Sequence, residues 1–133
     1  MSTKRRAPEE IVRRIGSICL ALPQVREEPA WAGVRWRVAA KTFAHVVMID
    51  RGWPHAFAKA AQTDGPLCVL TLRTPLRETD ASAFSNAPYF RPAWSSGIVG
   101  VKLQPNTDWD DISTLLIASY RRLAPSKLVE LMP

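Results

Sequence analysis

Alternation of apolar and basic residues over positions 34–38 is the feature that most restricts the fold of this chain. Val34, Trp36 and Val38 alternate with Arg35 and Arg37. A period of two puts the apolar side chains on one side of an extended strand and the arginines on the other. Because the apolar side needs cover, we expect an antiparallel sheet with one face packed against a second layer and one face in water.

Three later segments have the composition of further strands. Residues 42–49 are rich in strand-forming residues and follow the first strand after a short connection, which predicts a hairpin. Residues 66–73 and 98–103 predict the third and fourth strands, whose alternation places Cys68, Leu70 and Leu72, and Val99, Val101 and Leu103, on the inward side. Residues 51–65 have turn residues at both ends and alanines that favour a short helix over 54–61, so an elaborated hairpin tip is predicted there.

Amphipathic helices are predicted near both ends of the chain. The segment 8–22 begins with a proline and two glutamates, and its apolar residues form one stripe: Ile11, Val12, Ile15, Ile18, Cys19 and Leu22. The segment 108–123 has aspartates in its first turn and the stripe Trp109, Ile112, Leu116, Tyr120 and Leu123. A shorter helix is predicted from Thr74, its N-cap, to about Phe84. Residues 24–31 are interpreted as a linker.

The predicted order of elements is helix, three strands, helix, strand, helix. Short connections favour antiparallel pairing, so the sequence predicts an α+β two-layer sandwich: a four-stranded antiparallel sheet with its helices on one face. A chain of 133 residues is expected to form a single domain over positions 1–133, with 51–65 as an insert and 125–133 as a tail.

Composition excludes several classes of protein. Apolar residues make up 47% and charged residues 23% of the chain, as in ordinary soluble globular proteins. No apolar run approaches the ~20 residues needed to cross a bilayer, and the N-terminal residues contain no cleavage pattern. Cys19 and Cys68 have neither metal-binding nor redox spacing, which fits a reducing compartment. We therefore expect a cytoplasmic protein that uses no membrane, cofactor or structural metal.

No catalytic motif is found in the sequence. It contains no Walker or Rossmann glycine loop, no H-E-x-x-H and no G-x-S-x-G. His45 is a lone histidine in a predicted strand, where a packed or hydrogen-bonded role is more common than catalysis. The aspartates near position 108 are explained by helix capping. The chain is expected not to be an enzyme, and an uncharacterised catalytic activity is the third hypothesis.

Basic residues gather on the face predicted to point away from the helices. The net charge is +6, and strand parity places Arg35, Arg37, Arg73 and Lys102 on this face with no carboxylate. Beside it we expect an ordered, non-helical loop at residues 87–94, because two prolines restrict its backbone. This loop carries three aromatic residues and a cation: Tyr89, Phe90, Arg91 and Trp94.

Two functional hypotheses follow from this surface. The first is a DNA-binding protein that contacts phosphates through Arg35, Arg37, Lys41, Arg73, Arg91 and Lys102, with Tyr89 and Trp94 shaping the contact. The alternative is a protein-interaction or small-ligand module, in which exposed Leu67 and Val69 and the aromatic loop form an apolar patch. A merely solvated arginine face, with Trp94 and Phe90 in the core, also stays open.

Short sequence pieces occur in a specific order along nearly the whole chain. They are Leu22-Pro23-Gln24-Val25 with Glu27-Glu28 and Trp31; Trp36-Arg37-Val38 before Lys41-Thr42-Phe43-Ala44; Leu70-Thr71-Leu72; Ala87-Pro88-Tyr89 with Trp94; and Leu116-Ile117-Ala118-Ser119-Tyr120. In these pieces the chain resembles the MmcQ/YjbR family of small bacterial proteins. The resemblance implies a frataxin-like (CyaY-like) fold, described for that family as a double wing, and a DNA-binding role.

Two departures from the family pattern concern the hairpins. The family usually has a glycine where this chain has Ala39-Ala40, and residues 51–65 are longer than the second hairpin of the family. We therefore expect the wings to differ in shape. Frataxins have acidic iron-binding helices, and the positive net charge of this chain argues against iron binding here.

Overall fold

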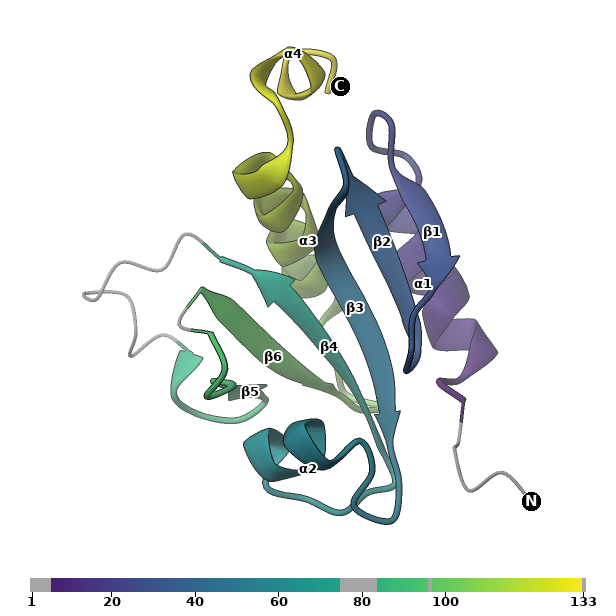
Figure 1. Ribbon diagram of the computed structural model, residues 1–133, viewed down its shortest axis with the longest axis vertical. Coiled ribbons are helices and arrows are strands. Elements are labelled where there is room, and N and C mark those ends of the chain that lie inside the picture. Colours follow the sequence, from purple (N-terminus) through teal and green to yellow (C-terminus); the bar gives the residue numbers. More distant parts are fainter. Residues whose placement is uncertain (1–5, 75–83, 96, 133) are drawn as a thin grey trace.

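A six-stranded antiparallel sheet forms the centre of the molecule in the computed structural model, which describes residues 6–74, 84–95 and 97–132 (Figure 1). The strand order is β1-β2-β3-β4-β6-β5. The strands are β1 (Arg26–Pro29), β2 (Val34–Val38), β3 (Lys41–Ile49), β4 (Leu67–Arg73), β5 (Tyr89–Phe90) and β6 (Ile98–Leu103). The helices are α1 (Glu9–Cys19), α2 (His55–Ala61), α3 (Trp109–Leu123) and α4 (Ser126–Val129). The predicted α+β class with an open antiparallel sheet is confirmed.

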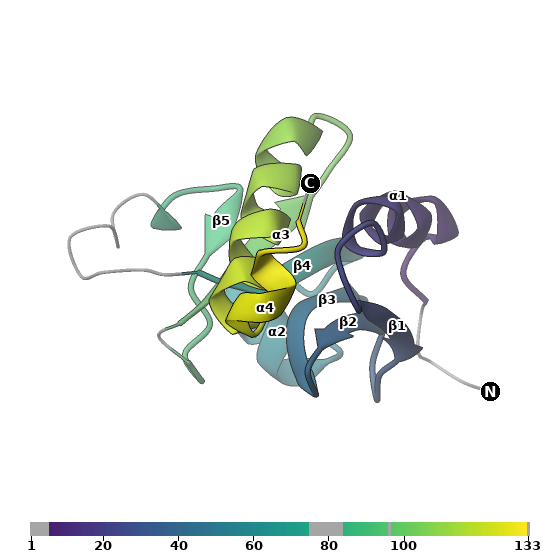
Figure 2. The same cartoon turned by 90° about the horizontal axis from the view of Figure 1, so that it is seen from above.

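The prediction was wrong in the number of strands in the sheet and in the placement of the helices on one face. The sheet has six strands rather than four, because β1 lies in the expected linker and β5 lies in the aromatic loop. The helices are not all on one face. Figures 1 and 2 show α1 and α3 against one face of the sheet and α2 against the opposite face.

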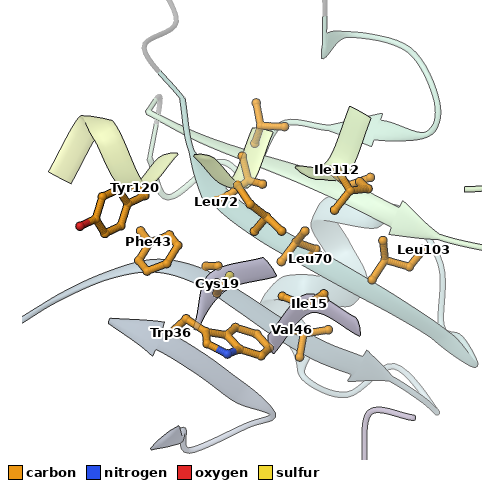
Figure 3. Close-up of a cluster of buried hydrophobic side chains, with 14 of the residues drawn as sticks. Ile15, Cys19, Trp36, Phe43, Val46, Leu70, Leu72, Leu103, Ile112 and Tyr120 are labelled. Atoms are coloured by element: carbon orange, nitrogen blue, oxygen red, sulfur yellow. The ribbon is translucent and has the colours of Figure 1, made fainter. Parts of the chain in front are cut away.

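The face under α1 and α3 contains the main hydrophobic core. Figure 3 shows side chains from both helices meeting those of the central strands. The fully buried members include Ile15, Trp36, Phe43, Val46, Leu70, Leu116 and Tyr120. Trp36 donates its indole N–H to Glu27 Oε1 at 2.8 Å, and the Tyr120 hydroxyl donates to the Pro23 carbonyl oxygen at 2.8 Å. The inward positions predicted for β2, β4 and β6 are confirmed.

The β2–β3 hairpin turns through Ala39 and Ala40. Both have positive φ, 49° and 65°, as the two central residues of a type I′ turn require. The pairing of β2 with β3 shifts register between Trp36 and Arg37, just before the turn, and both Phe43 and Ala44 on β3 are buried in the main core. The chain therefore makes with alanines a turn that usually contains Asn or Gly.

The 51–65 segment contains the predicted short helix, observed as α2. Thr74 donates its backbone N–H to the Gly97 carbonyl oxygen at 3.1 Å. Positions 75–83, which make up most of the helix predicted from Thr74 to Phe84, lie outside the described residues. Among the residues that the structure describes, no helix is long and apolar enough to cross a membrane.

Candidate nucleic-acid interface

Helix α2 covers part of the sheet face opposite α1 and α3. Its residues Phe57, Ala58 and Ala61 form a second buried cluster with residues of the sheet: Val47, Ile49, Val69 and Phe90. Val69 is completely buried and Leu67 is half-buried against the same cluster. The predicted exposed apolar patch of Leu67 and Val69 is therefore wrong, because α2 packs on it.

Beyond α2, the same face is basic. Cross-strand pairing joins Arg26 with Arg37, Glu28 with Arg35, and Arg35 with His45, while Arg73 ends β4 on this side. We name this uncovered surface the arginine face: Arg26, Glu28, Arg35, Arg37 and Arg73. The outward direction predicted for Arg35, Arg37 and Arg73 agrees with the register, because their strand neighbours Trp36, Val38 and Leu72 are in the main core.

A carboxylate does lie on this surface, contrary to the prediction. Glu28 Oε1 accepts hydrogen bonds from Arg35 Nε at 2.8 Å and from a terminal nitrogen of Arg37 at 3.0 Å, and a second Arg35 nitrogen lies 2.7 Å away. The hydrogen bond from Arg37, with the contributions of Arg35, lowers the pKa of the Glu28 carboxyl. One carboxylate shared by two guanidinium groups orders both side chains and leaves the pair with a net positive charge.

A shallow groove lies on this face between β3, β4 and α2. Its volume is about 140 Å³, and its lining includes Thr42, His45, Phe57, Thr71, Arg73, Trp94 and Ile98. Trp94 is 47% exposed, and its ring lies 5.0 Å from that of Phe57 at an interplanar angle of 60°. Trp94 is thus on the surface, beside Arg73, rather than in the main core.

His45 has a structural position in the floor of this groove. Its Nε2 lies 2.6 Å from the Ala32 carbonyl oxygen, which can only accept, so Nε2 carries the proton. The ring contacts Phe57 edge-on at 5.7 Å. Burial lowers the pKa of His45, with a smaller contribution from the Arg35 charge, and the imidazole is neutral at pH 7. The packed, hydrogen-bonded role expected for a lone strand histidine matches this geometry.

The other predicted site residues lie around and beyond the arginine face. Lys41 is exposed at the β2–β3 turn and pairs with Val38 of the main core, so it lies on the side of the sheet opposite the arginine face. Arg91 is half-buried just after β5, and Lys102 is half-buried on β6 opposite Val69. Arg26 and Glu28 were missed, since β1 was interpreted as a linker. Their spacing of two residues in the sequence was the available signal.

Tyr89 lies on the opposite side of the sheet from Trp94. It pairs with Val101 of the main core, and its ring contacts Phe84 at 5.0 Å. Burial raises the pKa of Tyr89, and the charges of Asp111 and Asp108 raise it further. A hollow of about 430 Å³ lies there, lined in part by Pro88, Tyr89, Lys102, Asp108 and Asp111. The structure therefore separates the two aromatic residues that were predicted to act together.

Comparison with known families gives the chain its identity. Residues 20–122 match the YjbR family model. The chain belongs to the MmcQ/YjbR family. The match includes all six strands of this YjbR protein, so the whole arginine face lies within it. No curated protein matches the chain. Within the described residues, no three His, Cys, Asp or Glu side chains gather as metal ligands would.

Proposed function

We propose that this YjbR-family protein is a non-enzymatic, DNA-binding protein whose arginine face contacts phosphates. One observation carries the proposal: register brings Arg26, Arg35, Arg37 and Arg73 onto the part of the sheet that α2 leaves uncovered. Arginine binds phosphate through two parallel N–H donors and keeps its charge at all physiological pH values. Lys41 pairs with Val38 of the main core, so it lies toward the other side of the sheet and is assigned a peripheral role.

Glu28 defines how the face would bind. It holds Arg35 and Arg37 in fixed positions, which lowers the conformational entropy that they lose when a phosphate arrives. It also competes with phosphate for the same N–H groups, so binding is expected to be weaker than the arginines alone would give. Lys102 lies on the same side of the sheet but pairs with Val69 of the second cluster, and Arg91 follows β5, so both are assigned a peripheral role in the proposal.

The fold type of the protein within the α+β class is also part of the proposal. We assign the protein to the frataxin-like, double-wing type implied by the family resemblance, as a single cytoplasmic domain. The antiparallel sheet with α1 and α3 on one face supports this assignment.

Salt-dependent DNA titration tests the main proposal. Fluorescence anisotropy with labelled duplex and single-stranded DNA should give a plot of log binding constant against log salt concentration with a slope of about −3 to −4, as expected for contact with about four phosphates. Replacing Arg35→Glu and Arg37→Glu together should abolish most of the binding. The matched control is Arg121→Glu with Arg122→Glu, because these exposed arginines at the end of α3 make the same change in net charge elsewhere.

The outcomes distinguish binding at the arginine face from attraction of DNA to the net positive charge of the protein. Loss of binding in the β2 double variant, with most binding kept in the α3 control, supports the arginine face. Equal losses in both variants would contradict it, because net charge alone would then explain the binding. Absence of binding to either DNA at low salt would reject the proposed function.

A small-ligand-binding module is the second candidate function. Its support is the hollow of about 430 Å³ beside the aromatic loop, which is within the size range of ligand sites, about 300–1,000 Å³. Aromatic and apolar groups from Tyr89 and Ile112 line it together with the Asp108 and Asp111 carboxylates. Thermal-shift screening of small metabolites would test this function. A shift that disappears in Tyr89→Ala would support it, and no shift with any compound would count against it.

A further inference from the structure

The ring of Trp94 is 47% exposed and contacts Phe57. Phe57 supports it from α2 and is itself only 6% exposed, because it is packed in the second cluster. Phe57 also contacts His45, so Trp94 is connected through Phe57 to both α2 and β3. A half-exposed tryptophan on a rigid base is the kind of platform on which nucleic-acid bases stack.

Positive charge approaches this platform from the sheet. Arg73 lines the same groove as Trp94, and Arg37 lies on β2, two strands from β4. Neighbouring strands are about 4.8 Å apart, so these two positions are roughly 10 Å from each other. A nucleic-acid backbone that crosses the strands could thus meet Arg37, then Arg73, and then place a base at Trp94.

The size of the groove restricts what can enter. At about 140 Å³ it is smaller than ordinary cofactor sites of about 300–1,000 Å³, and it suits part of a single ring system. In a duplex the faces of the bases are stacked against each other, so only an unpaired base can present its face to Trp94.

Building on the proposed DNA binding, we infer that the Trp94 groove takes up an unpaired base and that the preferred substrate is single-stranded DNA. The phosphates contribute the salt-dependent part of the affinity through the arginine face. Stacking on Trp94 contributes the part of the affinity that requires a base to be present. This part does not depend on which base it is, because every base has a π-face.

Three DNA probes of equal length separate these two parts: a deoxythymidine homopolymer, a strand of abasic sites and a matched duplex. We expect the wild-type protein to bind the homopolymer roughly 5- to 150-fold more tightly than the abasic strand, the range of one stacked base. Trp94→Ala should bring the homopolymer down to the level of the abasic strand and leave the duplex and abasic affinities unchanged. Quenching of tryptophan fluorescence by the homopolymer should fall in the same variant.

Trp31→Ala is the matched control. Trp31 is 68% exposed and lies against Trp53, at the other end of the β2 strand from the hairpin turn, so its removal takes away an exposed tryptophan outside the groove. Trp94→Phe keeps an aromatic face and should retain most of the preference for the homopolymer. Circular dichroism of each variant verifies that it is folded.

The inference and the function beneath it fail in different ways. Equal binding of homopolymer and abasic strand, with no effect of Trp94→Ala but a loss in the Arg35 and Arg37 double variant, would overturn the base site and leave DNA binding intact. An equal loss in Trp31→Ala would also overturn it. No binding of any of the three probes would overturn both.

Discussion

The two faces of the sheet differ in how far helices cover them. The main-core face is covered by α1, which has 11 residues, and α3, which has 15 residues. The opposite face has only α2, with 7 residues, and its buried cluster is correspondingly small. Because α2 is short, it covers only one end of the central strands (Figure 1). The arginine face and the Trp94 groove are the part of the sheet that remains.

The residues of β4 show the same difference between the two faces along the length of the strand. On the main-core side Cys68, Leu70 and Leu72 are apolar throughout. On the other side the residues change from apolar to polar: Leu67 and Val69 under α2, then Thr71, then exposed Arg73. The point at which a strand face changes from apolar to charged therefore marks the end of its cover, and charge gathers where no helix packs.

Adjacent residues on β2 give the largest contrast between the two faces. Trp36→Ala should lower the free energy of unfolding by about 3–5 kcal/mol, because it leaves a cavity in the main core and removes the indole donor of Glu27. Arg35→Ala should change it by no more than about 1 kcal/mol, since its ion pair is partly exposed. Urea unfolding of both variants measures the difference. Similar losses would mean that the faces are equally important for stability.

The second cluster should have an intermediate effect. Phe57→Ala removes a ring that is 6% exposed, and we expect a loss of about 3 kcal/mol in the free energy of unfolding. Because Phe57 supports Trp94, the same change should also weaken binding of the deoxythymidine homopolymer. Ala56→Gly, at an exposed position of the same helix, is the control for loss of helix stability alone. Stability lost without any change in homopolymer binding would show that Trp94 does not depend on Phe57.

Much of the fold follows from the sequence because its long elements have clear periodicity. The alternation in β2, β4 and β6 predicted the main-core side chains, and the apolar stripes predicted α1 and α3. β1 could not be recognised, because it has four residues, is largely exposed and ends in a proline. Pairing with β2, rather than its own composition, makes it a strand.

The sequence predicted the site only where the alternation of side chains along a strand determines their direction. Parity placed Arg35 and Arg37 outward, but missing β1 also meant missing their partner Glu28. Tyr89 and Trp94 are five positions apart in a loop with two prolines, so no simple period relates their directions. Their separation onto opposite faces depends on β5 pairing with β6, which is a tertiary contact.

His45, on the α2 side of the sheet, should make the stability of the protein depend on pH. Burial lowers its pKa in the folded protein, so the unfolded chain binds the proton more tightly. Stability should therefore be intact above the ordinary histidine pKa of about 6.5 and fall as the pH drops from there toward the lower folded value. Urea midpoints from pH 7.5 to pH 5 would measure this fall, which His45→Gln should reduce. An unchanged slope in His45→Gln would assign the acid sensitivity to other groups.

The smallest expected effect compares two neighbouring glutamates that point to different faces. Glu28→Gln removes the negative charge shared by Arg35 and Arg37, and frees their N–H groups for phosphate. Glu27→Gln makes the same change in net charge, but Glu27 accepts from Trp36 on the main-core side, and the glutamine oxygen can still accept.

We expect Glu28→Gln to tighten DNA binding by roughly 2- to 5-fold, the size of a partly exposed ion pair, because phosphate no longer competes with the carboxylate. Glu27→Gln should give a smaller gain, since its charge lies farther from the bound phosphates and is screened by salt. Anisotropy titrations at two salt concentrations measure both variants. Equal gains would mean that only net charge matters. A loss of affinity in Glu28→Gln would mean that the order Glu28 gives to the two arginines outweighs its competition with phosphate.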